Sequence, residues 1–183
     1  MIIGEIPFFL KDGRPALLRS PRDEDIPGMR EYLRLSAAET EFILRYPEEC
    51  DRYTPEFEKQ MFEHINQSPN EAMLVCLADQ RVVGTSNIVF NRSLKTRHRG
   101  TVAIALIREY WGLGIGTRMF AEMIRVAKER GCVTQLELDY IEGNTRARAL
   151  YDKMGFRPYG IRPNAIRLKD GTMLNECLML KEL

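Results

Sequence analysis

The sequence has few of the side chains that bind structural metals. Only two of its 183 residues are histidines and only four are cysteines. The cysteines lie far apart, with no Cys-x-x-Cys pair and no histidine at ligand spacing, so we expect no structural zinc and no other metal. Scattered free thiols are typical of the reducing cytosol. The four cysteines are Cys50, Cys76, Cys132 and Cys177.

Long apolar runs are absent as well. No run approaches the roughly 18 residues that a membrane span needs. The apolar start of the chain lacks a basic region and is interrupted by Gly4, Glu5 and Pro7, so it does not fit a signal peptide. We therefore expect a cytoplasmic protein without a membrane partner.

Neither sign of charge is in excess. Lys and Arg number 27 and Asp and Glu number 26, a net charge of +1, so there is no basis for predicting a nucleic-acid partner. The charges are uneven, because residues 23–64 contain twelve acidic and five basic residues, a net −7. This segment is either a pair of solvated helices, as charge runs usually are, or an acidic surface that attracts a cationic ligand.

The length predicts one domain over residues 1–183, with 44% hydrophobic residues to form its core. Short apolar runs alternate with stretches of helical periodicity, which predicts an α/β fold, and Asp79-Gln80 is expected to form a hairpin turn. Strands are expected at 16–19, 73–78, 82–90, 101–107, 136–140, 156–159, 165–168 and 173–180. Helices are expected at 26–33, from residue 55, at 115–127 and at 145–154.

The strongest local pattern is a strand-like run that leads into Gly112, Gly114 and Gly116 at the start of an amphipathic helix. The first N–H groups of a helix lack intrahelical partners and lie at the positive end of its dipole, so such a loop can bind phosphate. A plain tight turn is the alternative. A Walker loop does not fit, because Thr117 follows the last glycine, and a Rossmann loop would need a glycine at Thr117 or Met119.

A second pattern lies on the expected helix at 145–154. Asn144 and Tyr151 are seven residues apart, which places them on nearly the same helix face, with the small Ala147 between them. They could line one groove. Alternatively, Asn144 is a helix N-cap and Tyr151 is a core aromatic whose hydroxyl bonds to the backbone.

Together, the two patterns resemble the GNAT superfamily of acetyl-coenzyme A-dependent N-acetyltransferases. Trp111 stands where the family often has Arg or Gln, and Trp-Gly is similar to the branch that contains ribosomal-protein N-terminal, polyamine and antibiotic acetyltransferases. The resemblance implies a single-domain GNAT-like α/β fold, with a mixed, mostly antiparallel sheet of six to seven strands and four flanking helices. It implies acetyl-CoA as co-substrate and a primary amine as acceptor, and it leaves a homodimer open.

The resemblance also implies roles for particular residues. Tyr151 matches the family's general acid. The positions that match the family's cofactor-binding residues are Ala105, Leu106, Ile107, Trp111, Gly112, Leu113, Gly114, Ile115, Gly116, Thr117 and Asn144.

The general base is the open point. Family members that act on protein lysines have a glutamate at the position of Gly100. His98 would lie on the same strand face and titrates near neutrality, and Glu137 on the following strand is another candidate. Each also has a structural interpretation, as a surface histidine and as a solvated carboxylate, and a water chain could serve as the base.

The predicted function is therefore acetyl transfer to a small cationic molecule or a protein N-terminus by direct attack of the amine in a ternary complex. The alternative is a non-catalytic module that binds or senses acyl-CoA. Gly100 motivates this alternative, whereas Tyr151 argues against it.

Overall fold

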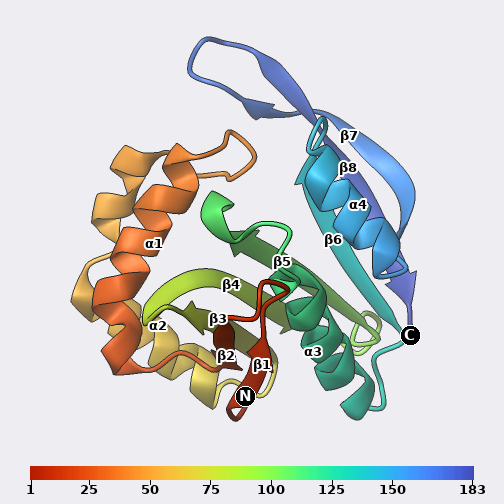
Figure 1. Ribbon diagram of the computed structural model, residues 1–183. Helices are drawn as coiled ribbons and strands as arrows, with labels where there is room; N and C mark the ends of the chain where they lie inside the picture. The colour runs from red at the N-terminus through yellow and green to blue at the C-terminus, as the bar shows by residue number, and fades with distance from the viewer. The chain divides into compact units, whose positions relative to one another are not determined.

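The computed structural model describes residues 1–183 (Figure 1). Its strands are β1 (Ile6–Phe9), β2 (Pro15–Arg19), β3 (Glu71–Ala78), β4 (Arg81–Phe90), β5 (Arg99–Leu106), β6 (Gln135–Ile141), β7 (Arg157–Arg167) and β8 (Met173–Glu182). Its α-helices are α1 (Ile26–Ala38), α2 (Pro55–Gln67), α3 (Ile115–Glu129) and α4 (Thr145–Lys153). Three short 3-10 helices are η1 (Asp23–Asp25), η2 (Pro47–Arg52) and η3 (Arg108–Tyr110).

The hydrogen-bonded strand order is β1-β2-β3-β4-β5-β6-β8-β7. The pairing of β5 with β6 is parallel, and the β1–β2, β2–β3, β3–β4, β6–β8 and β7–β8 pairs are antiparallel. The predicted α/β class with a mixed, mostly antiparallel sheet is confirmed, and so are the four helices. The expected six to seven strands are too few: the sheet has eight, because Ile6–Phe9 adds a strand that no pattern predicted.

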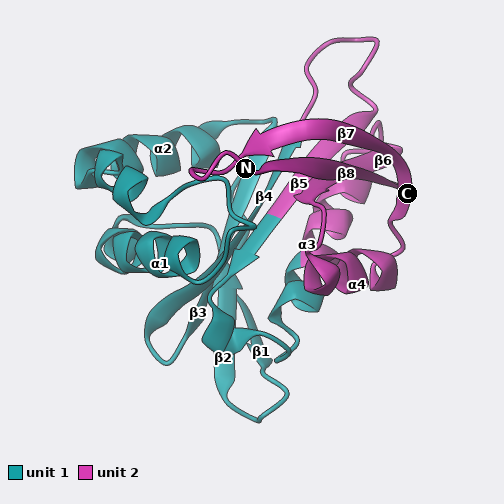
Figure 2. Ribbon diagram, turned by 90° about the horizontal axis from the view of Figure 1, so that it is seen from above, with its two compact units in different colours: residues 1–89, 104–119 teal, residues 90–103, 120–183 magenta.

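The chain divides into two compact units (Figure 2). Unit 1 contains Met1–Val89 and Ile104–Met119. Its β3–β4 hairpin turns at Asp79 and Gln80, both with positive φ, as a tight two-residue hairpin requires. Helices α1 and α2 belong to the same unit. Helix α2 starts after the N-cap Thr54, whose side-chain oxygen accepts a hydrogen bond from the Phe57 N–H. The largest fully buried side chains of this unit include Tyr32, Phe62, Leu18, Met29 and Leu74.

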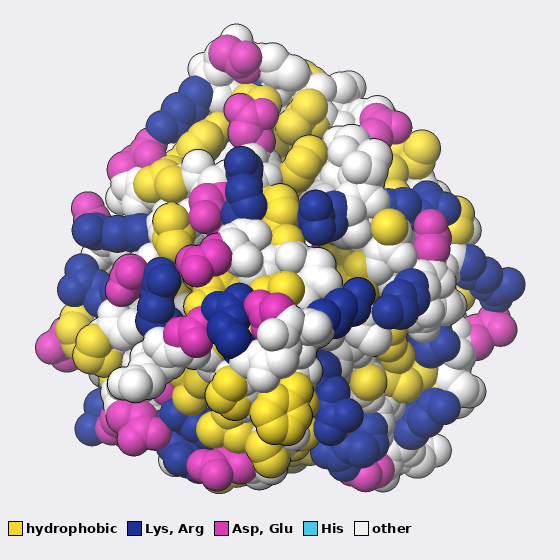
Figure 3. Space-filling view, in the orientation of Figure 1, with side chains coloured by type: hydrophobic (Ala, Val, Ile, Leu, Met, Phe, Trp, Pro, Cys, Tyr) yellow, Lys and Arg dark blue, Asp and Glu magenta, His cyan; other side chains and the backbone are white.

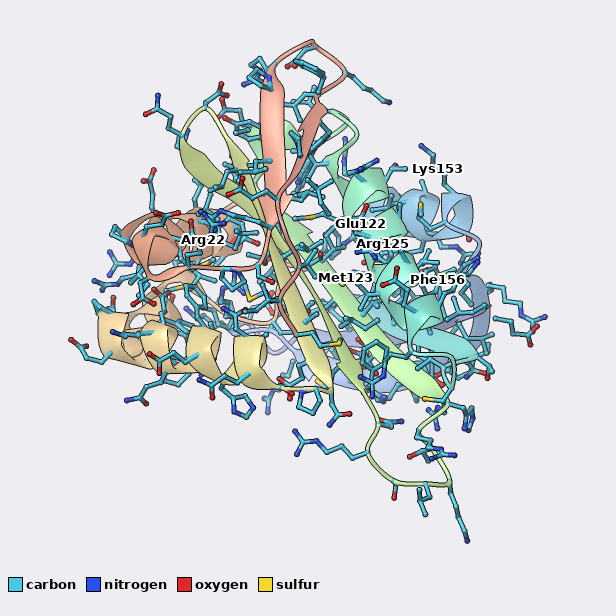
Figure 4. All side chains as sticks on the ribbon, turned by 90° about the horizontal axis from the view of Figure 1, so that it is seen from below. Arg22, Glu122, Met123, Arg125, Lys153 and Phe156 are labelled. Atoms are coloured by element: carbon cyan, nitrogen blue, oxygen red, sulfur yellow. The ribbon has the colours of Figure 1, made fainter.

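Unit 2 contains Phe90–Ala103 and Phe120–Leu183. Strand β8 pairs with β6 on one side and β7 on the other, and α4 connects β6 to β7. The inner face of α3 is apolar, with Phe120, Met123 and Ala127 buried, while Glu122 and Arg125 form an ion pair of 2.8 Å one turn apart (Figure 4). This helix therefore follows the predicted amphipathic pattern.

The acidic segment 23–64 covers η1, α1, η2 and α2. Several of its charges are paired: Lys59 lies 3.3 Å from Asp23, and Arg34 pairs with Asp51. On the face drawn in Figure 3, Lys and Arg side chains are interspersed with Asp and Glu. These contacts support the interpretation of the segment as solvated helices.

No helix is both long enough and apolar enough to span a bilayer. The four cysteines are free thiols. No three His, Cys, Asp or Glu side chains are grouped in a way that could hold a metal ion.

Candidate functional site

The glycine loop of unit 1 has the backbone geometry of an anion-binding turn. Gly112 has φ +80° and Gly114 has φ +94°, conformations that glycine adopts without steric cost. Nothing lies within 4 Å of the position where Gly112 would carry a Cβ, so that side of the loop is open. The first helical bond runs from the Arg118 N–H to the Gly114 carbonyl, so the N–H groups of Ile115 and Gly116 lie at the positive end of α3. The loop can therefore accommodate a diphosphate.

The end of β5 leads into this loop. The Tyr32 hydroxyl donates to the Ala105 carbonyl at 3.0 Å, and the Trp111 indole Nε1–H donates to the Leu106 carbonyl at 2.8 Å. The buried Ile107 donates its N–H to the Val83 carbonyl. Trp111 thus fixes the chain between strand and loop, an assignment that the sequence did not supply.

Gly84 on β4 permits this arrangement. A Cβ at residue 84 would lie 2.1 Å from Leu106 Cδ2 and 3.1 Å from the Ala105 carbonyl oxygen. A larger side chain would displace the Leu106 side chain and crowd the Ala105 carbonyl. The glycine is required by close packing at the strand that carries three of the predicted cofactor-binding residues.

Asn144 of unit 2 is the N-cap of α4. Its Oδ1 accepts a hydrogen bond from the Ala147 N–H at 3.1 Å, so the N-cap role that the sequence offered as an alternative is confirmed. Capping uses the oxygen and leaves the side-chain amide group as a donor. Capping and ligand binding are therefore compatible roles for this residue.

Tyr151 lies in an aromatic cluster of unit 2. Its ring packs against Phe120 at 5.5 Å, Tyr140 at 5.7 Å and Phe156 at 6.4 Å between centroids, and the residue is only 6% exposed. Burial raises the pKa of its phenol, and the negative charge of Asp139 raises it further. No hydrogen bond of the hydroxyl contributes to that shift, so the backbone partner expected for a core tyrosine is not found. The ring is thus buried, while the hydroxyl makes no hydrogen bond to another group of the chain.

Asp139 is a site candidate that the sequence analysis missed. The parallel ladder of β5 and β6 ends at Thr101 and Glu137, so Asp139 lies two residues beyond the last pair. It is exposed. Burial is the larger cause of the raised pKa of both Tyr151 and Glu176, and the negative charge of Asp139 raises both pKa values further. The sequence offered no signal for it beyond a carboxylate on a strand.

Glu137, one of the two predicted bases, is held by neighbouring side chains. It accepts two hydrogen bonds from Arg99, at 2.6 and 2.5 Å, and one from Gln135 at 2.6 Å. The hydrogen bonds from Arg99 hold its pKa below the ordinary range. A carboxylate with a lowered pKa is a weaker base, and this one already has an ion-pair partner.

His98, the other predicted base, is exposed and immediately precedes β5, at the opposite end of that strand from Leu106. Its carbonyl accepts from the N–H groups of Thr134 and Gln135. Gly100 is buried, and a Cβ there would lie 3.0 Å from Phe90 and 3.2 Å from Leu136. Packing therefore explains why residue 100 is a glycine.

A separate groove of about 1230 Å³ runs along α1 and η2 in unit 1. Apolar residues such as Ile26, Leu35 and Pro47 line it together with Arg30 and Asp51. It contains none of the residues predicted for the site.

The comparisons with known proteins agree on the family. Residues 39–156 match the model of the acetyltransferase (GNAT) family. A GNAT-family acetyltransferase from Streptococcus pneumoniae superposes with a TM-score of 0.83 at 24% identity, covering 92% of this chain and 99% of that one. A ribosomal-protein-alanine N-acetyltransferase from Brucella melitensis gives 0.76 at 25% identity, covering 91% and 99%.

A third solved structure includes the cofactor. RimL, a ribosomal L7/L12 α-N-protein acetyltransferase in complex with coenzyme A, superposes with a TM-score of 0.75 at 15% identity, covering 92% of this chain and 94% of that one. At this identity the likeness shows the fold. The family match covers more than half of the chain, including the glycine loop and Tyr151. The chain belongs to the acetyltransferase (GNAT) family and is an acyltransferase of the N-acetyltransferase type.

Proposed function

We propose that this protein transfers the acetyl group of acetyl-CoA to a primary amine, on a small cationic molecule or a protein N-terminus. The observation that carries the proposal is the loop from Trp111 to Gly116, whose positive-φ glycines lead directly into the N-terminus of α3. That geometry suits a diphosphate. The coenzyme A complex of RimL, which shares the fold, supports the choice of cofactor.

The residues proposed to bind acetyl-CoA would contact it through both backbone and side-chain groups. Residues Ala105, Leu106 and Ile107 would contact the pantetheine arm through backbone groups other than the two carbonyls that Tyr32 and Trp111 already bond and the Ile107 N–H that bonds to Val83. Those from Trp111 to Thr117 would hold the diphosphate, and the Asn144 amide would donate a hydrogen bond to the cofactor. These roles follow the family, and the positive-φ glycines and the Asn144 cap are compatible with them.

Acyl transfer to an amine has three requirements that this chain can meet. The reactants must be held in line, the thioester carbonyl must be polarised, and the departing thiolate must be protonated. A backbone N–H near Leu106 would stabilise the developing oxyanion. Tyr151 would protonate the thiolate, because its hydroxyl is unpaired and its raised pKa keeps it protonated at neutral pH.

We further propose Asp139 as the group that accepts the proton of the amine. It is exposed, lies beyond the last β5–β6 pair and is electrostatically coupled to Tyr151, whereas Glu137 is occupied by Arg99. The roles of His98 and Glu137 as base stay predictions. An amine nitrogen that attacks a carbonyl gains positive charge, so a nearby carboxylate also stabilises the developing cation.

Replacing Asp139 by Asn separates these candidates. We expect kcat/KM to fall roughly tenfold at pH 7, with partial recovery at higher pH, where more of the amine is already neutral. The matched variant Glu137→Gln should keep its activity near that of the parent and lose stability instead, because Arg99 loses its ion pair. Full activity of Asp139→Asn together with a large loss in Glu137→Gln would assign the base to Glu137.

The overall proposal is tested by cofactor binding and thiol release. Acetyl-CoA should raise the melting temperature by several degrees, because it binds only the folded protein, while NADH and ATP should do much less. A panel of polyamines, aminoglycosides, amino acids and peptides with free N-termini would then be screened for release of the coenzyme A thiol. The proposal would be refuted if NADH bound more tightly than acetyl-CoA. It would also be refuted if no acceptor in the panel raised thiol release above the background rate.

The proposal extends to the domain organisation, the cellular location and the partners of the enzyme. Residues 1–183 would act as one catalytic domain in the cytoplasm, with acetyl-CoA and an amine as its partners and with neither nucleic acid nor membrane required. A homodimer stays a prediction.

A further inference from the structure

The turn between β1 and β2 lies against the glycine loop, about a hundred residues later in the chain (Figure 1). The Lys11 N–H donates to the Leu113 carbonyl at 3.1 Å. The Cγ of Lys11 lies 3.7 Å from the position where Gly114 would carry a Cβ. Both segments belong to unit 1, so this contact brings a lysine to the loop that we propose to hold the diphosphate.

An ion-pair network anchors this turn. Arg14 pairs with Asp12 at 2.7 Å and with Asp79 at 2.5 Å, and its guanidinium lies 5.1 Å from the centre of the Tyr110 ring. The hydroxyl of the buried Tyr110, which directly precedes the loop, donates to Asp79 at 2.8 Å. Arg14, Asp79 and Tyr110 therefore connect the turn that contains Lys11 to the start of the glycine loop.

The charge of Lys11 is not neutralised within the chain. Its side chain is exposed and makes no ion pair, while Arg14 pairs with Asp12 of the same turn and with Asp79 of the β3–β4 turn. Beyond Cγ the side chain extends by three bonds, about 4 Å of reach. Its compact ammonium on a flexible stem can thus reach an anion that lies over Gly114.

We propose that Lys11 is a further cofactor-binding residue, whose ammonium contacts the diphosphate of coenzyme A. The inference rests on the proposed function. The loop N–H groups and the helix dipole offer only partial positive charges, whereas each phosphate of the diphosphate carries a negative charge. A full positive charge beside the loop supplies the missing compensation and forms charge-assisted hydrogen bonds.

The test is titration calorimetry with coenzyme A and with dephospho-coenzyme A, which keeps the diphosphate and lacks the 3′-phosphate. The variant Lys11→Gln should bind both ligands roughly 5-fold more weakly than the parent at low salt, and the difference should shrink at high salt through screening. Lys11→Arg should retain most of the affinity. The matched control Lys128→Gln removes an exposed lysine on α3 and should leave both dissociation constants unchanged.

The outcomes distinguish a failure of the role of Lys11 from a failure of the proposed function. Unchanged affinity of Lys11→Gln for dephospho-coenzyme A overturns the role of Lys11, and so does a loss confined to coenzyme A, because the contact would then be to the 3′-phosphate. A parent protein that binds neither ligand refutes the proposed function itself. Melting curves of each variant show that it is folded and as stable as the parent.

Discussion

Removing only the hydroxyl of Tyr151 should lower turnover roughly 100-fold while leaving the fold and the cofactor affinity nearly intact. The expectation follows from the surroundings of the ring in Tyr151→Phe. Phe120, Tyr140 and Phe156 pack against the ring and would pack equally well against phenylalanine. Since no group of the chain bonds to the hydroxyl, its removal leaves no buried partner unsatisfied, and the stability should change by less than about 1 kcal/mol.

The neighbouring Tyr140 provides the matched control. Its hydroxyl accepts from Arg148 at 3.3 Å, so it already has a partner within the chain. Tyr140→Phe should therefore keep turnover within a fewfold of the parent. Rates are measured in single-turnover experiments, so that product release does not hide the chemical step. If Tyr151→Phe turned over at the parent rate, Tyr151 would not be the general acid.

The conformation of the glycine loop and the N-cap of α4 could be predicted because their signals are local. Gly112 and Gly114 have the positive φ that a loop of this kind requires, and Asn144 caps the helix that its position predicted. The turn at Asp79-Gln80 was also predicted from adjacent residues. Such features depend on a few consecutive dihedral angles, which the residue types largely determine.

Two strands show where local patterns fail. Strand β1 contains Pro7 and has only half-buried and exposed residues, which is tolerated because it pairs on one side only. Strand β7 was expected as two short strands, at 156–159 and 165–168, and Gly160 and Pro163 lie between them. The structure keeps it as one strand with register shifts at those places, since its pairing with β8 compensates for the interruptions.

The carboxylate that we propose as the base could not be predicted because its choice depends on contacts between distant residues. Asp139 and Glu137 alternate with buried leucines on the same strand and look alike in the sequence. They differ only through their neighbours: Arg99 binds Glu137, whereas Asp139 lies beyond the end of the ladder and influences Tyr151. Gly100 is explained in the same way, by the side chains of Phe90 and Leu136.

A buried acid in α2 leads to the second large expected effect. Glu58 is 0% exposed, and neither of its carboxylate oxygens has a hydrogen-bond partner. Burial raises its pKa to about 7, although the charge of Arg30 acts in the opposite direction. Because the folded protein holds this proton more tightly than the unfolded chain, whose glutamate has a pKa near 4.3, Glu58 lowers stability progressively as the pH rises between these two values.

Replacing Glu58 by Gln removes this titration and keeps the shape of the side chain. The free energy of unfolding of Glu58→Gln should exceed that of the parent by less than about 1 kcal/mol at pH 5 and by roughly 3 kcal/mol at pH 8. Urea denaturation at both pH values measures the difference, and Glu56→Gln, at an exposed position of the same helix, should show no such trend. A loss at pH 8 would mean that Glu58 is ionised and stabilised in the folded protein, and a gain that does not grow with pH would mean that folding does not raise its pKa. The direction of the effect thus decides whether the inner face of α2 contains a neutral acid or a charge.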